Sequence, residues 1–166
     1  MKKTLCVLSL FIACAVHAQT VDIPKNYSFE SPEDYARYED DVVASIDWLV
    51  STPLDKHTKK QEKVQQFIFT WLMGAPNVSV DLNDEIVTFL GSSPQILIIF
   101  MSGWARNTIK TGVDTKLEGN VAGIETVVEY YMSNKSLLEK DSNIEAYVDM
   151  VEEDTLREYI QKILEK

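Results

Sequence analysis

The segment from Pro94 to Ile109 constrains the fold most, because it is apolar on nearly every side. Ile96 to Met101 form an uninterrupted apolar run, and Trp104, Ala105 and Ile109 continue it. A helix of this kind, shorter than the ~20 residues that cross a membrane, normally lies in the middle of a helical bundle. The sequence therefore predicts a central buried helix over residues 94–109.

Helix-start signals recur along the rest of the chain. In a capping box, a Ser or Thr side chain caps the first turn, and a Glu or Gln three residues later reaches back to it. The pattern occurs at Thr58/Gln61, Thr115/Glu118, Ser136/Glu139, Ser142/Glu145 and Thr155/Glu158, while Ser31-Pro32 and Ser93-Pro94 place a proline after the cap. Proline at the first helical position loses no hydrogen bond. The set predicts an all-helical fold.

Apolar spacing marks the individual helices. A single stripe between residues 32 and 50 predicts the first helix, and a stripe from Val64 to Leu72 that stops at Gly74 predicts the second. The short loop of residues 51–56 makes these two an antiparallel hairpin. Later stripes predict helices over residues 117–131, 144–151 and 156–164, with a short turn at Leu137 and Leu138.

One segment alternates like a strand. Val78 to Leu82 places apolar and polar residues in turn. A single strand without a partner leaves its backbone groups unsatisfied, so we expect an extended connector there instead. We expect it to lead into a short helix from Asp84 to Leu90 that Gly91 closes.

The N-terminus reads as a secretory signal peptide over residues 1–18. Lys2 and Lys3 precede the apolar run from Leu5 to Val16, and a small residue, Ala18, ends the segment. Cleavage there starts the mature chain at Gln19, and the junction resembles those of exported bacterial proteins. The alternative is lipidation at Cys14, with membrane attachment through it. Otherwise we expect an exported chain, periplasmic or extracellular, with no membrane-spanning segment.

Domain organisation follows from these patterns. Residues 19–30 carry Pro24 and no helical stripe, so they predict an extended N-terminal arm. Residues 31–166 predict one all-α domain, a single compact bundle of five to seven helices around the central one. Both cysteines, Cys6 and Cys14, lie in the signal segment. A chain cleaved after Ala18 therefore contains no disulfide, and its core alone must stabilise it.

Charge and residue types exclude several functions. The whole chain has a net charge of −10, and removal of the first 18 residues leaves 14 basic against 26 acidic side chains, a charge of −12. Nucleic acid binding needs clustered Lys and Arg, so we exclude it.

Beyond the signal, His57 is the only histidine. Multi-histidine zinc sites and cysteine nucleophiles are absent, and we expect neither a metal site nor a cofactor.

The clearest candidate binding residues form a basic cluster, Lys56, His57, Lys59, Lys60 and Lys63, at the start of the second predicted helix. A helix N-terminus is already positive, so this clustering is locally unfavourable. It suggests a small-anion site built from amide and ammonium groups. The competing interpretation is a set of solvated lysines compensated by acidic residues nearby.

Carboxylates suggest two further possibilities. Paired acids can drive glycoside hydrolysis, which requires one carboxyl in an apolar pocket and another in a polar one. Asp141, Asn143, Glu145, Asp149 and Glu152 partly match positions one, three, five, nine and twelve of a calcium loop, but Ala146 stands where the loop needs glycine, and the spacing favours a helix. We assign no catalytic residue.

By elimination, the sequence favours a non-catalytic binding module whose partner is an unknown protein or small ligand. Trp71, Tyr130 and Tyr131 are candidate anchors for such a partner. The alternatives are a secreted carboxylate-dependent hydrolase and a small-anion-binding module at Lys56–Lys63. Gly119 and Gly123 share one helix face and predict tight packing inside the bundle.

Overall fold

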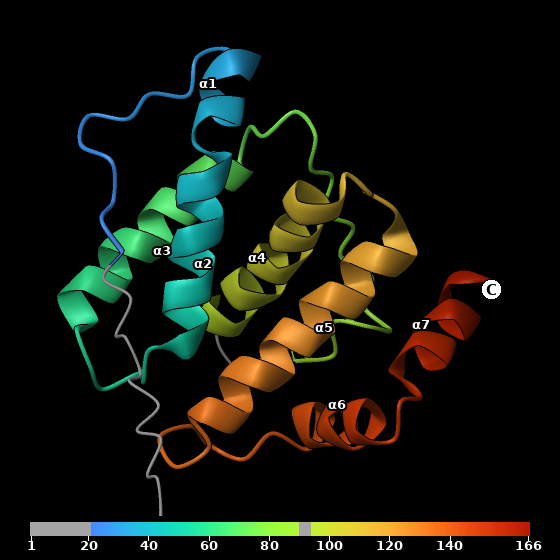
Figure 1. The fold of residues 1–166 in the computed structure, drawn as a ribbon. Helices are drawn as coiled ribbons and strands as arrows, with labels where there is room; N and C mark the ends of the chain where they lie inside the picture. The colour runs from blue at the N-terminus through green and yellow to red at the C-terminus, as the bar shows by residue number, and fades with distance from the viewer. Residues whose placement is uncertain (1–20, 90–93) are drawn as a thin grey trace, which may run out of the picture.

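The computed structural model describes residues 21–89 and 94–166, and over these ranges the protein is all-helical with no strand (Figure 1). The helices are α1 (Pro32–Arg37), α2 (Glu39–Ser51), α3 (Thr58–Leu72), α4 (Pro94–Thr111), α5 (Lys116–Ser133), α6 (Ser142–Glu152) and α7 (Leu156–Leu164). None of them combines the length and apolarity needed to cross a membrane. The predicted signal peptide, Gln19, Cys14, Gly91 and the Ser93 cap lie outside the described residues.

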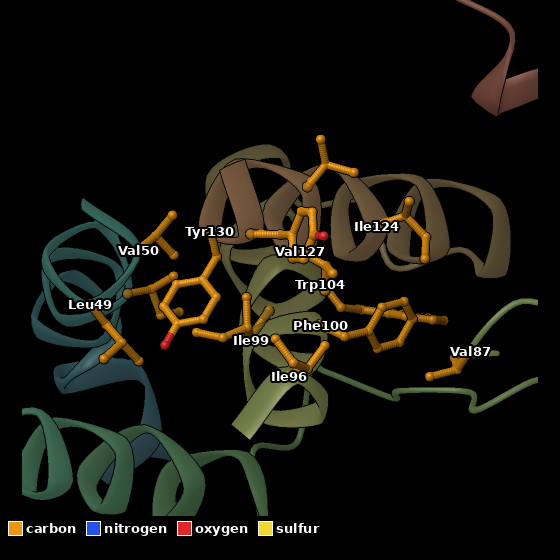
Figure 2. Packing of buried hydrophobic residues seen from close by; sticks show 14 of the residues in the cluster. Leu49, Val50, Val87, Ile96, Ile99, Phe100, Trp104, Ile124, Val127 and Tyr130 are labelled. Atoms are coloured by element: carbon orange, nitrogen blue, oxygen red, sulfur yellow. The ribbon is translucent and has the colours of Figure 1, made fainter. Parts of the chain in front are cut away.

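Helix α4 lies at the centre, as its apolar sequence predicts. It packs against α2, α3 and α5, and it forms its most extensive contact with α5. Figure 2 shows Ile96, Ile99, Phe100 and Trp104 meeting side chains from α2 and α5 around it. All four are almost fully buried. The burial of these large apolar side chains from water is the main driving force for the arrangement.

Glycines let α5 approach α4 closely. A Cβ atom added at Gly123 would lie 2.6 Å from the Phe100 ring, and one at Gly119 would overlap the Trp104 ring. The rings of Phe100 and Trp104 therefore occupy the space that side chains would fill on α5. The predicted role of these two glycines in internal packing is confirmed.

The first predicted helix is broken into α1 and α2. Tyr38 separates them with φ −102° and ψ 6°. Its ring packs edge-on against Phe29 and Phe67, at centroid distances of 5.5 and 6.4 Å. Three acids, Glu39 to Asp41, then occupy the first turn of α2, where negative charge favours a helix start. The apolar stripe continues across the break, which is why periodicity predicted one helix.

Two predicted caps are present. The Ser31 hydroxyl accepts a hydrogen bond from the Asp34 amide at 3.3 Å, and the Ser31 amide donates to the Asp34 carboxylate at 3.1 Å. Thr115 caps α5 by accepting from the Glu118 amide. These side chains satisfy amide groups that a helix start leaves without partners.

The other capping predictions were wrong in detail. His57, not Thr58, stands at the N-cap of α3, while Gln61 turns inward and donates to the Pro53 and Lys56 carbonyls. Asp141, not Ser142, caps α6. Two more predicted caps fail: Ser136 starts no helix, and Thr155 makes no side-chain capping bond. At α6 the Asp141 carboxylate, one residue earlier, accepts from the Asn143 and Ile144 amides, and at α7 the Thr155 hydroxyl donates instead to the Met150 carbonyl.

The predicted helix over residues 84–90 is also wrong in its described part, residues 84–89. That segment forms turns, and the Asn83 side chain accepts a hydrogen bond from the Glu85 amide. Ile86, Val87 and Phe89 are all buried, so this segment enters the core from turns. The preceding residues 78–82 form the expected connector without strand pairing.

The described part of the N-terminal arm, residues 21–30, packs onto the helices without forming one. Val21 is buried, and the rings of Tyr27 and Phe29 contact Phe67 of α3 at 4.9 and 6.0 Å between centroids. The arm therefore contributes aromatic side chains to the edge of the core.

The close contact between α4 and α5 makes Gly123→Ala a test of the packing. The added methyl group must displace the Phe100 ring, so we expect a loss of about 1–3 kcal/mol in stability. In a chain of this size the melting temperature falls by about 2–4 °C per kcal/mol. Thermal unfolding followed by circular dichroism measures the change. Glu62→Ala, on the exposed side of α3, is the control, and equal melting of the two variants would contradict this packing.

Candidate functional site

The basic cluster does not converge on one point. Lys56 pairs with Asp55 at 2.9 Å. The Lys60 ammonium lies 4.9 Å from the centre of the Trp48 ring, and His57 packs near the same ring at 6.2 Å. His57 itself adopts a left-handed conformation, with φ 51°. Lys59 and Lys63 are exposed on the outer side of α3. The structure therefore brings together His57, Lys60 and Trp48 and leaves two lysines in solvent.

The three aromatic anchors predicted from the sequence are not available to a partner. Trp71, Tyr130 and Tyr131 expose 2% or less of their surfaces. The adjacent residues Tyr130 and Tyr131 are both in the core. Helix α5 is covered on two sides, by α4 and by α6 and α7, so neighbouring positions both face protein.

Residues 141–152 do not form a calcium loop. They cap and form α6, as their apolar spacing predicts. Within residues 21–89 and 94–166, no group of three or more His, Cys, Asp or Glu side chains could hold a metal ion. The arrangement of acids along α6 is that of an ordinary exposed helix face.

A different site lies beside α5, and we term it the polar trough. It consists of two adjoining cavities of about 560 and 220 Å³, which share Asn107, Ala122 and Glu125 as lining residues. The larger cavity lies between α5 and the corner that joins α6 to α7, and the smaller one between α4 and α5. None of the lining residues of either cavity is aromatic.

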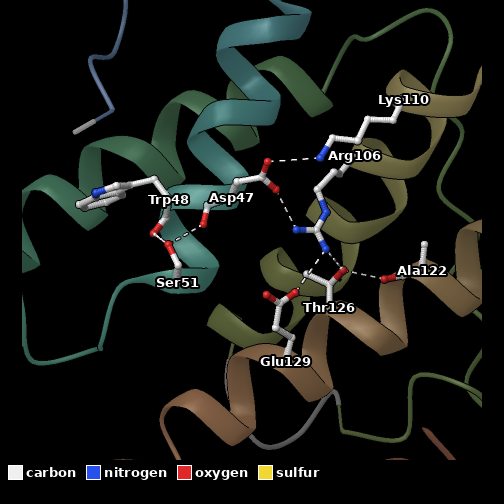
Figure 3. Close-up of polar contacts among 8 residues, drawn as sticks. All are labelled: Asp47, Trp48, Ser51, Arg106, Lys110, Ala122, Thr126 and Glu129. Atoms are coloured by element: carbon white, nitrogen blue, oxygen red, sulfur yellow. Dashed lines mark hydrogen bonds and ion pairs between the residues drawn. The ribbon is translucent and has the colours of Figure 1, made fainter. Parts of the chain in front are cut away.

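Arg106 forms one end of the polar trough and ties three helices together (Figure 3). Its guanidinium group donates to Asp47 of α2 at 2.9 Å and to the Thr126 hydroxyl of α5 at 3.0 Å. It also lies 3.5 Å from the Glu129 carboxylate. Lys110 donates to the second Asp47 oxygen at 3.2 Å. The cations at this end are therefore already paired with carboxylates.

A second ion pair closes the other end of the polar trough. Arg157 of α7 donates two hydrogen bonds to the two Glu118 oxygens of α5, at 2.8 and 2.6 Å. Hydrogen bonding to Arg157 lowers the pKa of Glu118, so this carboxylate stays ionised. A bidentate pair fixes the geometry of both groups as well as their charge. It holds α7 against α5 and so maintains the wall of the larger cavity.

Glu125 lies between these two ends, where the cavities meet. Among the described residues its carboxylate forms no hydrogen bond and no ion pair, because Arg106 and Arg157 are engaged elsewhere. The Glu125 side chain is exposed to solvent. The walls nevertheless bury the carboxyl enough to raise its pKa, and the two arginines only partly oppose that shift. The folded protein therefore compensates the charge of Glu125 only in part.

Two other polar groups of the polar trough also have no partner. The Nδ2 atom of Asn107 is buried and donates to no acceptor in the described part of the chain. The Asp154 side chain, at the α6–α7 corner, forms no hydrogen bond or ion pair there either. Buried polar groups in proteins are normally satisfied, so the buried Asn107 amide, beside the exposed carboxylates of Glu125 and Asp154, marks a place suited to a ligand.

Sequence reasoning did not find this site. Glu118 and Glu125 are seven residues apart on one face of α5, a spacing common on any exposed helix. Only the fold places Asn107 of α4 and the α6–α7 corner beside them. The one available signal was the boundary between the predicted helices over residues 144–151 and 156–164, which implied a corner but not what it would face.

The uncompensated charge of Glu125 predicts a pH-dependent effect of Glu125→Gln. The folded pKa lies above its ordinary value of 4.5, so ionisation of Glu125 disfavours folding. We expect the variant to be more stable than the native chain at pH 7, by up to about 2 °C in melting temperature. The difference should vanish as the pH falls below about 4.5, because both chains are then neutral at this position. A variant that is less stable at pH 7 would contradict the assignment.

Comparison with known proteins places the chain in no family. No family model, curated protein or solved structure matches it. The function must therefore be argued from the site itself, because one helical architecture can carry many unrelated activities.

Proposed function

We propose that the chain is a non-catalytic binding module whose polar trough holds a small ligand with a cationic group. The observation that supports this most directly is Glu125, a carboxylate with no partner in the described residues at the junction of two cavities. A bound cation would compensate its charge and remove the penalty of its partial burial. Proteins that keep a destabilising group commonly do so for function.

The walls of the larger cavity favour an alkylammonium ligand over a bare ion. Val121, Ala122, Val151 and Leu156 provide apolar surface beside Glu125 and Asp154. An alkyl stem can lie along such surface while its ammonium group donates hydrogen bonds to the two carboxylates. Lysine side chains and aliphatic diamines share this chemistry. The signal-like residues 1–18 support placing this binding role outside the cytoplasm, in an exported chain.

A carboxylate-dependent hydrolase is the second candidate, and one observation favours it. The pKa of Glu125 is raised by burial, whereas that of Glu118 is lowered by Arg157, which resembles the acid and base environments that hydrolases need. However, Arg157 donates to both Glu118 oxygens, so this carboxylate is not free to attack or to activate water. Binding is therefore the function that the geometry supports better.

Calorimetric titration with 1,4-diaminobutane tests the proposal. We expect binding at low ionic strength, at least tenfold weaker binding by Glu125→Gln, and no binding of 1,4-butanediol, which lacks the charge. Glu62→Gln removes the same charge from the exposed side of α3 and should bind like the native chain. Equal weakening by both variants would mean that the diamine senses only net charge, and the proposal would fail.

A further inference from the structure

We propose that the outer face of α3 binds a segment of a partner protein that carries carboxylates and, further along, apolar side chains. The α3 outer face is defined by Lys59, Lys63, Phe69 and Met73. These residues lie on one side of the helix, because their spacings follow the helical repeat. The face is separate from the polar trough, none of whose lining residues belongs to α3.

Unpaired cations concentrate on this helix. Within residues 21–89 and 94–166, five basic side chains form no ion pair, and three of the five belong to α3: Lys25, Lys59, Lys60, Lys63 and Lys140. Lys60 stacks over Trp48, whereas Lys59 and Lys63 are exposed. The first turn of α3 contains no acid. Glu62 is exposed on the same side of α3, but neither it nor any other acid in the described part of the chain forms an ion pair with these two lysines.

Exposed apolar side chains follow on the same face. Phe69 and Met73 expose 41% and 70% of their surfaces, and Met73 is the most exposed large apolar residue of the described chain. Ten residues separate Lys59 from Phe69 and Lys63 from Met73, which corresponds to about 15 Å along a helix. An extended partner segment covers that distance with about five residues between its acidic and apolar parts.

A polypeptide fits this face better than a lipid surface. An anionic membrane is a broad plane, and it would meet acidic side chains around the lysines as well, including the exposed Glu62 of α3 itself. The net negative charge of the chain opposes such an approach. A narrow peptide can contact α3 alone. Charge complementarity therefore favours an acidic protein segment as the occupant.

A labelled synthetic peptide tests the inference with the full chain. The probe carries four glutamates, a five-residue Gly-Ser spacer and Leu-Phe-Leu, and its twin has lysines in place of the glutamates. Fluorescence anisotropy at low salt should show binding of the acidic probe and none of the twin. Lys59→Glu with Lys63→Glu, and separately Phe69→Ser with Met73→Ser, should each weaken binding at least tenfold. Circular dichroism checks that both variants remain folded.

A control variant away from α3 tests whether the loss of binding is specific to the α3 outer face. Lys140→Glu with Leu137→Ser changes an unpaired lysine and an exposed leucine away from α3, and should leave binding unchanged. Equal weakening by this control, or no binding by the native chain, would overturn the inference. A native dimer that Lys59→Glu with Lys63→Glu dissociates, or tighter binding to anionic phosphatidylglycerol vesicles than to the probe, would also overturn it. Either result would assign the face to another occupant.

Discussion

The close packing of α4 against α5 is the constraint on which the rest of the molecule depends. Glycines on α5 accept the rings of Phe100 and Trp104 from α4, so the two longest helices approach until large side chains interlock with backbone. Because protein interiors have almost no free volume, few other arrangements of these two helices would pack as closely. Helix α2 then covers one side of the pair, and α6 and α7 cover the other side of α5.

This arrangement also produces the polar trough. Polar and apolar side chains of α4, α5, α6 and α7 line two adjoining cavities beside α5. Ion pairs at Arg106 and Arg157 fix the two ends and satisfy the arginines, which leaves Glu125 without a partner between them. A carboxylate that the fold partly buries but does not pair is the feature that gives the site its chemistry.

The sequence predicts much of the fold because apolar spacing reports which helix faces are buried. It correctly indicated α4 as the central helix and the glycine face of α5. It failed where tertiary contacts override local preference: at Tyr38, whose ring packs on the aromatic arm, and at Ile86 and its neighbours, which enter the core from turns. The polar trough was not predictable, since its residues come from four helices and a corner whose approach no spacing encodes.

Native-state hydrogen exchange tests the central claim most directly, because it reports the free energy at which each helix opens. If the α4–α5 pair holds the molecule together, amide groups of these two helices should exchange slowest, and only through global unfolding. Helices α6 and α7 should open at lower free energy, since fewer large buried side chains attach them to the pair. Faster exchange in α4 and α5 than in α2 and α3 would contradict the claim.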